Sequence, residues 1–231
     1  MKKIIWTNNT DVRLGFEVEC IVRHGSFHTQ FNEAMRPLRT KLSIGSDGSI
    51  QCGNYEHPLE IRTKPLPPKK ALELLKTIFD NVNKFGFTNA SCGLHVNISS
   101  ARRAKMRNFN PLPFLSSSLW NEILRKFNRR GNTYCKPILR LNSRRVSKVH
   151  AFKSFGNVIN DKYRCVNLCN FGNGTSKSSR VEIRGFGNAN YTQKFPNIEQ
   201  FVKRIERLFK LSCGNIPLTR RIAVWARLDI L

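Results

Sequence analysis

The sequence predicts an α+β fold in which a largely antiparallel sheet is flanked by helices. One reason is that short segments of alternating apolar and polar residues recur along the chain, as expected for half-buried strands. A second is that two longer segments have apolar residues at helical spacing. A third is that these segments do not follow the regular strand–helix–strand order that builds a parallel sheet.

The first strand is expected at residues 13–22, where every second residue is apolar. The apolar members are Leu14, Phe16, Val18, Cys20 and Val22. Glu17 and Glu19 lie on the opposite face. Paired carboxylates on one strand face can hold Mg²⁺ beside the phosphates of a nucleotide, because hard cations prefer oxygen ligands. The same spacing is common on a solvated strand face, which is the alternative interpretation.

A glycine-rich turn around Asp47 is expected at residues 43–53. The strand that follows carries Glu60 and Arg62 on its polar face. An amphipathic helix is then predicted at residues 69–85. This order brings a further carboxylate to the sheet, just ahead of the helix.

The stretch NASCGLHVNI, residues 89–98, alternates again and places His95 and Asn97 side by side on the polar face of a strand. A lone histidine there is typical of a structural role. On the sheet that carries the carboxylates, a neutral imidazole could instead bind a metal or hydrogen-bond a phosphate.

The remaining elements are expected after residue 160. Strands are predicted at residues 161–171 and 179–188, a second amphipathic helix at residues 197–211, and a short closing helix or strand at residues 220–231. Between the two halves, residues 101–164 contain sixteen Lys and Arg residues against two acids. We expect a basic, mostly helical elaboration there, at about residues 101–160.

The chain has a formal net charge of +25, and such an excess attracts polyanions. Nucleic acid, either DNA or RNA, is the leading expected partner, and an anionic membrane is a weaker one. Adaptation to surroundings rich in nucleic acid is the alternative. The residues expected to contact nucleic acid are Arg102, Arg103, Lys105, Arg129, Arg130, Arg144, Arg145 and Lys148.

Neither the apolar segments nor the cysteines indicate export or membrane insertion. No segment approaches the about 20 apolar residues of a membrane span, and the N-terminal apolar patch is too short for a signal peptide. Seven cysteines without a CxxC pair argue against a disulfide framework and a zinc ribbon. We expect a cytoplasmic protein without a membrane partner, in the host cytoplasm if the protein is viral.

The chain has only fifteen acidic residues, and several fall in strand or glycine-punctuated motifs. These are Glu17, Glu19, Asp47, Glu56, Glu60 and Glu182. If the strands pair into one sheet, we expect these carboxylates and His95 to converge on one polar face. Arg184, with Lys162 or Arg62, would supply the positive charge that phosphates require. The alternative for Arg184 is a salt bridge with Glu60 or Glu182.

Five blocks of the sequence carry a resemblance to a known family. They read LGFEVEC, SDGSI followed by GNYEHPLEIRTKPL, SCGLHVNI, DKYRCVNL and VEIRGFGN. In order and spacing they resemble the blocks of the amidoligase family, which is related to glutamate–cysteine ligase and glutamine synthetase. The resemblance implies a sheet curved into an ATP-binding funnel, within one catalytic domain that spans residues 1–231. It also implies ATP-dependent joining of a carboxylate to an amine.

The resemblance assigns roles to individual residues. The implied Mg²⁺ ligands are Glu17, Glu19, Glu60 and Glu182. The implied ATP contacts are His95, Asn97, Lys162 and Arg184, and the implied catalytic residues are Arg184, Glu182 and His95. Asn97 stands where the family pattern has a second histidine, and an amide is a weaker metal ligand than an imidazole.

Three function classes are compatible with these observations. The first is an ATP-dependent carboxylate–amine ligase that forms an amide or isopeptide bond through an acyl phosphate, on or near a polyanion such as nucleic acid. The second is a catalytically degenerate member that binds nucleic acid or has a structural role, which Asn97 permits. The third is a metal-dependent nuclease that uses the same acids.

Overall fold

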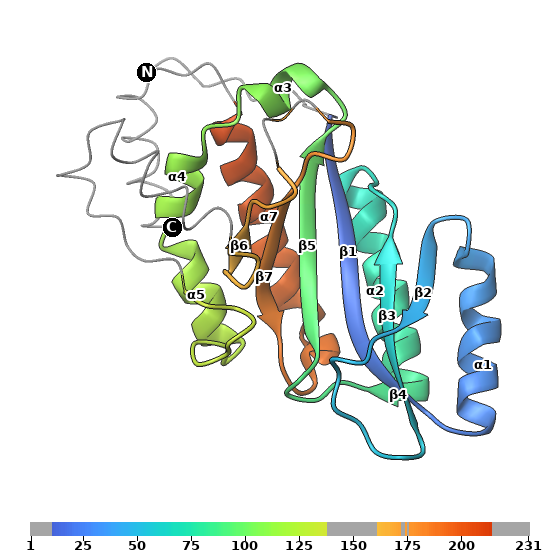
Figure 1. The fold of residues 1–231 in the computed structure, drawn as a ribbon. Coiled ribbons are helices and arrows are strands. Elements are labelled where there is room, and N and C mark those ends of the chain that lie inside the picture. Colours follow the sequence, from blue (N-terminus) through green and yellow to red (C-terminus); the bar gives the residue numbers. More distant parts are fainter. Residues whose placement is uncertain (1–10, 138–160, 172–173, 175, 214–231) are drawn as a thin grey trace.

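The computed structural model describes residues 11–137, 161–171, 174 and 176–213 (Figure 1). Their strands form one open antiparallel sheet in the order β2-β3-β1-β5-β7-β6, and the short β4 pairs with the end of β1. The strands are β1 (Val12–Arg23), β2 (Leu42–Ser46), β3 (Glu56–Thr63), β4 (Gly86–Phe87), β5 (Gly93–Ser100), β6 (Val166–Asn167) and β7 (Val181–Gly187). This confirms the predicted α+β class with a largely antiparallel sheet.

Two long helices, α2 (Pro68–Phe85) and α7 (Phe195–Ser212), cover one face of this sheet. The other described helices are α1 (Ser26–Met35), α3 (Arg103–Arg107), α4 (Pro111–Ser116) and α5 (Leu119–Lys126), with 3-10 turns η1 (Arg36–Leu38) and η2 (Tyr191–Lys194). Figure 1 shows α2 and α7 side by side behind the sheet. None of the described helices is long and apolar enough to cross a membrane.

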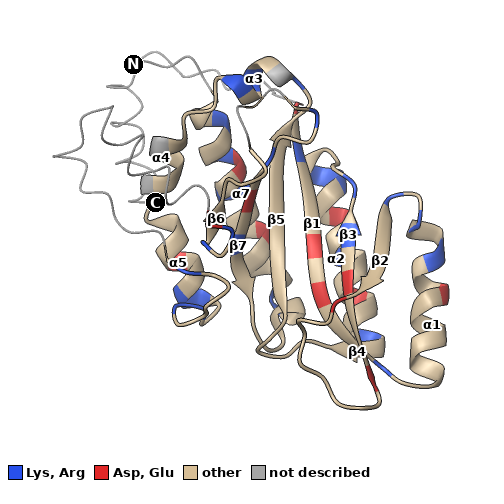
Figure 2. Ribbon diagram, in the orientation of Figure 1, with Lys and Arg blue, Asp and Glu red and all other residues tan. Residues whose placement is uncertain are grey.

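The two faces of the sheet differ because each strand alternates. Val18 of β1 lies opposite Ile61 of β3 and Leu94 of β5, and Val96 lies opposite Ile183 of β7. All five side chains are buried in the core beneath α2 and α7. The opposite face carries the acidic residues, which Figure 2 shows in red along β1 and β3. The alternation therefore gives the sheet a packing face and an opposite polar face, which we call the chemical face because it carries the acidic residues.

A tyrosine fixes the place where β1 changes partner. β1 pairs with β5 as far as Val18, and farther along its neighbour on that side is β4, opposite Ile21. The hydroxyl of Tyr191, a fully buried residue of η2, lies 2.8 Å from the carbonyl oxygen of Glu19 and 3.0 Å from that of Gly93. Its single O–H proton is therefore shared between two buried backbone acceptors at the point where the β1–β5 ladder ends.

Some element boundaries differ from the sequence prediction. Residues 42–46 form the edge strand β2, although most of them were expected in a turn. The strand expected at residues 161–171 is reduced to Val166–Asn167. It is short because the Asn167 side chain accepts a hydrogen bond from the backbone of Cys169, which turns the chain. The element expected at residues 220–231 lies outside the described residues.

The basic segment is helical as far as the described residues reach. Helices α3, α4 and α5 follow one another between residues 103 and 126, and α4 packs on α7. Trp120 of α5 is buried, and its indole N–H donates to the carbonyl of Phe114 at 2.6 Å. The rest of the predicted elaboration, residues 138–160, lies outside the described residues.

Candidate active site

Strand register brings the predicted carboxylates and histidine together. Glu17 in the middle of β1 lies opposite His95 of β5, and Glu19 lies opposite Glu60 of β3. Asn97 of β5 lies opposite Glu182 of β7. Because opposed residues on neighbouring strands share a face, these six side chains form one cluster that spans four strands.

His95 is at the centre of the cluster. Its Nδ1 lies 3.0 Å from Glu17 Oε2 and 3.5 Å from Glu182 Oε1, and its Nε2 lies 3.5 Å from Glu19 Oε1. The ring is 4% exposed. Burial by itself would lower the pKa of His95, but the hydrogen bond to Glu17 and the charges of Glu19 and Glu182 outweigh burial and the nearby Arg184, so the pKa is raised. The alternation predicted the face of His95 but not its burial.

Glu17 is held ionised by its neighbours. Burial alone would raise its pKa, yet the hydrogen bond from His95, the positive charge of His95, the amide of Asn97 and the charge of Arg180 lower it to about 2. Glu19 is fixed differently, because its Oε2 accepts the backbone N–H of Gly93 at 2.5 Å. Both carboxylates are thus anchored, and neither is a freely solvated surface acid.

Glu60 is in a less favourable environment. Burial raises its pKa, and so does the negative charge of Glu17, while the ion pair with Arg62 acts in the opposite direction. The pKa of Glu60 is raised overall. A positive charge placed between Glu17 and Glu60 would relieve this repulsion.

Glu182 and Arg184 form an ion pair at 2.6 Å between Oε1 and an Arg184 guanidinium nitrogen. The other oxygen of Glu182 accepts from Asn167 at 2.8 Å. Arg184 also reaches the carbonyl of Tyr134 at 3.3 Å. The salt bridge considered as an alternative for Arg184 is therefore present, and it holds the guanidinium at the edge of the carboxylate cluster.

Two polar residues of this face were not singled out in the sequence. Arg180 donates from Nε to Asn97 Oδ1 at 2.9 Å, while the amide nitrogen of Asn97 donates to Glu17 at 3.0 Å. Asn167 is the hydrogen-bond partner of Glu182. For Arg180 a signal existed, since residues 180, 182 and 184 share one face by alternation. For Asn167 the signal was its place in the DKYRCVNL block, which carries part of the family resemblance.

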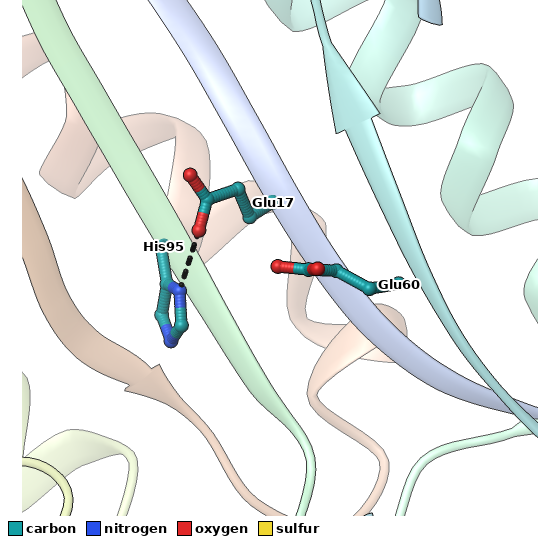
Figure 3. Close-up of side chains that lie close together, drawn as sticks. All are labelled: Glu17, Glu60 and His95. Atoms are coloured by element: carbon teal, nitrogen blue, oxygen red, sulfur yellow. Dashed lines mark hydrogen bonds and ion pairs between the residues drawn. The ribbon is translucent and has the colours of Figure 1, made fainter. Parts of the chain in front are cut away.

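The donor set fits a divalent cation. One carboxylate oxygen each of Glu17 and Glu60 and one ring nitrogen of His95 lie within 4.8 Å of one another. Figure 3 shows the three side chains directed toward one another from β1, β3 and β5. Carboxylate oxygens with a single imidazole suit Mg²⁺ or Mn²⁺. The positive charge of such an ion would also stabilise the ionised carboxylate of Glu60, which burial and the charge of Glu17 disfavour.

Several predicted residues are not part of this cluster. Lys162 is exposed and lies over the ring of Tyr163 at 5.0 Å. Asp47 accepts from Ser49 within its turn. Glu56 accepts the backbone N–H of Gly53. These contacts join residues that are close in sequence, and they stabilise the conformations of their loops.

One predicted nucleic-acid contact is wrong. Arg129 is 4% exposed, and its guanidinium donates to the carbonyl of Cys92 at 3.0 Å. It lies against Gly187, whose φ of 134° and closeness to Cys92 leave no room for a side chain. Buried in this way, Arg129 is a packing residue and does not reach a surface phosphate.

For the other basic residues, contact with nucleic acid stays a prediction. Arg102 and Lys105 both form ion pairs with Asp11, at 3.1 and 2.9 Å. Arg130 is exposed. The side chain of Arg103 and the residues Arg144, Arg145 and Lys148 lie outside what the structure describes.

The fold and site define an open antiparallel sheet whose chemical face holds carboxylates, an imidazole and arginines. The family model described as "Putative amidoligase enzyme" matches residues 10–186. The chain belongs to this family, and its membership supports an activity of the ligase type. A comparison with curated proteins gives no match.

Among solved structures, the chain is similar to the glutamine synthetase of Plasmodium falciparum, determined by cryo-electron microscopy. The TM-score is 0.43 and the sequence identity is 12%, over 87% of this chain and 52% of that chain. The chain therefore spans about half the length of that synthetase.

Proposed function

We propose that the protein is an ATP-dependent carboxylate–amine ligase that forms an amide or isopeptide bond through an acyl phosphate. The observation that carries this proposal is the cluster of Glu17, Glu19, Glu60, Glu182 and His95 on one sheet face, bordered by arginines. Hydroxide is a poor leaving group, so a carboxylate must be activated before an amine can displace it. Transfer of the γ-phosphoryl group of ATP provides that activation.

The catalytic task is to position the reactants and neutralise charge. Glu17, Glu60 and His95 would hold a Mg²⁺ ion, which would supply positive charge to offset that of the ATP phosphates. Glu19, held by the backbone of Gly93, keeps a further carboxylate oriented next to His95. His95 serves as a ligand in its neutral form, and the carboxylates around it fix its ring.

The arginines act on the phosphates and substrate. Arg184 is oriented by Glu182, so its remaining N–H groups are available to an oxygen of the transferring phosphoryl group. Glu182 would orient the incoming amine or hold a second ion. Asn97 links Glu17 to Arg180, which places a second guanidinium at the side of the site opposite Arg62.

The proposed acceptor is, or is bound to, a polyanion such as nucleic acid. The net charge of +25 supports this part of the proposal, because a basic surface raises the local concentration of an anionic substrate. Figure 2 shows acidic residues along the neighbouring strands β1 and β3, while the surrounding helices carry both basic and acidic residues. An acidic centre in a chain with a large net positive charge suits an enzyme that attracts a polyanion and binds Mg²⁺ on the sheet.

The test is to trap the activated carboxylate. Purified protein would be incubated with Mg²⁺, ATP and a panel of amino acids and peptides, with hydroxylamine as the amine. We expect a hydroxamate together with ADP and phosphate, and none with Glu17→Gln. Adding DNA or RNA to matched reactions measures whether a polyanion stimulates turnover.

A second candidate function is favoured by Asn97, which is engaged with Glu17 and Arg180 at the position of the second family histidine. In that case the protein kept the fold, lost turnover and binds nucleic acid. Mg²⁺-dependent ATP binding without hydroxamate or ADP formation would favour this candidate. Cleavage of the added DNA or RNA would favour a nuclease over both.

A further inference from the structure

Three of the five histidines of the chain meet away from the carboxylate cluster. His24 follows the end of β1, His28 lies in the first turns of α1, and His57 lies in β3. His57 is opposite Val22 in the sheet, so its side chain is on the helix-covered face and not on the face of Glu17 and Glu60. The proposed ligase function uses none of these three residues.

The three rings are in contact. Nδ1 of His24 lies 3.0 Å from Nε2 of His57, and the rings of His28 and His57 stack with centroids 4.2 Å apart. His24 and His57 also stack, at 5.1 Å. His57 and His28 are half-buried and His24 is exposed, so the group is accessible from solvent.

We propose that His24, His28 and His57 bind a divalent transition-metal ion of the zinc class. Imidazole nitrogen is a preferred ligand of Zn²⁺, Cu²⁺ and Ni²⁺, and three imidazoles with one water complete a tetrahedral zinc site. Two nitrogens bound to one tetrahedral zinc lie about 3.3 Å apart. The His24–His57 nitrogen pair at 3.0 Å is already close to this spacing.

The third ligand requires the side chain of His28 to rotate, because the three histidines do not have their ligand nitrogens grouped as those of Glu17, Glu60 and His95 are among the described residues. His28 stacks on His57, and its Nε2 lies 3.2 Å from the amide nitrogen of Asn32. Turning that amide lets its oxygen accept Nε2–H, which leaves Nδ1 of His28 as the ligand atom. Metal-bound histidines commonly have their second nitrogen oriented by such a partner.

Imidazoles bind a metal ion in their neutral form. Three adjacent imidazolium ions would repel one another, whereas a single shared ion removes that repulsion. An ion here would link the consecutive elements β1 and α1 to β3, which is farther along the chain, and would hold α1 against the edge of the sheet.

The direct test is calorimetric titration of the protein with Zn²⁺. We expect a binding event, separate from any event at the carboxylate cluster, that weakens at least tenfold in each of His24→Ala, His28→Ala and His57→Ala, together with a rise in melting temperature on adding Zn²⁺ that is smaller in these variants. His95→Gln and Cys52→Ser are matched controls, because they remove the active-site imidazole and an exposed thiol. Both should retain the event.

A second measurement leaves the three proposed ligands unchanged. The Cu²⁺-loaded His95→Gln protein should give an electron paramagnetic resonance spectrum with splitting from three imidazole nitrogens. Zinc binding that is equal in wild type and His57→Ala, or lost only in a control variant, overturns the proposal. A copper spectrum dominated by oxygen ligands also overturns it.

Discussion

At the residue scale, the site contains two carboxylates in opposite electrostatic situations. Glu17 receives hydrogen bonds from His95 and Asn97, and its pKa is lowered to about 2. Glu60 is buried beside Glu17 with Arg62 as its counter-ion, and its pKa is raised. The negative charge of Glu17 is thus stabilised by its hydrogen-bond partners. The negative charge of Glu60 is destabilised, as is common for groups at binding sites.

This difference predicts opposite effects of two isosteric substitutions. In metal-free protein at pH 7, Glu17→Gln should lower the free energy of unfolding by about 3 kcal/mol, because the ionised group is the one stabilised. Glu60→Gln should raise it, because a repelled buried charge is removed. Urea unfolding with a chelator measures both. Destabilisation by Glu60→Gln as large as that by Glu17→Gln would contradict the assignment.

The pH dependence follows from the sign of the Glu17 shift. A lowered folded-state pKa means that the contribution of Glu17 is fully present above its unfolded pKa of 4.5 and is lost as pH falls toward about 2. The difference in stability between wild type and Glu17→Gln should therefore shrink across this window. Unfolding curves at half-unit pH intervals measure it, and a difference that is constant down to pH 2 would refute the shift.

Arg180 gives a second prediction at this scale. If its guanidinium serves an anionic ligand next to Glu17, Arg180→Met should weaken Mg²⁺–ATP binding by about 1.5–3 kcal/mol, as for a lost hydrogen bond to a charged group. Arg180→Lys should lose less. Arg125→Met removes an exposed arginine of α5 and serves as the control. Equal affinities in Arg180→Met and the control, measured by calorimetry, would exclude Arg180 from the site.

At the scale of elements, the strand pattern predicted the chemical face well. Alternation in β1 and β5 was enough to place Glu17 and His95 on one face, since a strand has only two. The pattern could not predict that His95 is buried, because burial depends on Glu19 and Glu182 from other strands. Nor could it predict the irregular register between β5 and β7 that sets where Arg184 points.

The short strand β2 shows another limit. Its Ser43, Gly45 and Ser46 have low strand propensity, and β2 exists because β3 offers an edge with which it can pair.

The same dependence on tertiary contacts explains why the predicted nucleic-acid contact of Arg129 is wrong. A basic residue in a basic segment suggests a surface contact, whereas its actual partner is the Cys92 carbonyl, distant in sequence.

The junction between β1 and β5 yields the prediction at this scale. The Tyr191 hydroxyl lies between the backbone carbonyls of Glu19 and Gly93. The backbone N–H of Gly93 in turn holds the carboxylate of Glu19. Tyr191→Phe leaves buried acceptors unsatisfied and should cost about 1–3 kcal/mol of stability. It should also weaken Mn²⁺ binding, because Glu19 loses its support. Thermal unfolding and calorimetry measure the two effects, and Tyr134→Phe, at an exposed tyrosine, is the control.

At the scale of the whole molecule, charge is divided between centre and periphery. The chain carries 40 Lys and Arg residues against 15 Asp and Glu residues, yet four of the acids are gathered on one face of the sheet. A like-charged cluster is costly unless cations offset it, and the described cations there are His95, Arg62, Arg180 and Arg184. The arrangement is consistent with a metal centre in a protein that attracts anions.

The polyanion part of the proposal makes the last prediction. Affinity for DNA or RNA should fall steeply with salt, because each neutralised phosphate releases condensed counterions. Replacing Arg144, Arg145 and Lys148 with Glu should reduce both the affinity and the salt slope. Mg²⁺–ATP binding should stay unchanged, since the carboxylate cluster is formed by other segments of the chain.

Fluorescence anisotropy with labelled oligonucleotides across a salt series measures these slopes, and Arg129→Met is a suitable counterpart. Arg129 is buried against Cys92 and Gly187, so its removal should lower stability and leave the salt slope intact. A slope that is unaffected by the triple reversal would move the polyanion contact to another surface. A net charge of +25 should attract phosphates most strongly at low salt. Absence of affinity under that condition would contradict the polyanion part of the proposal and leave the charge as an adaptation to surroundings rich in nucleic acid.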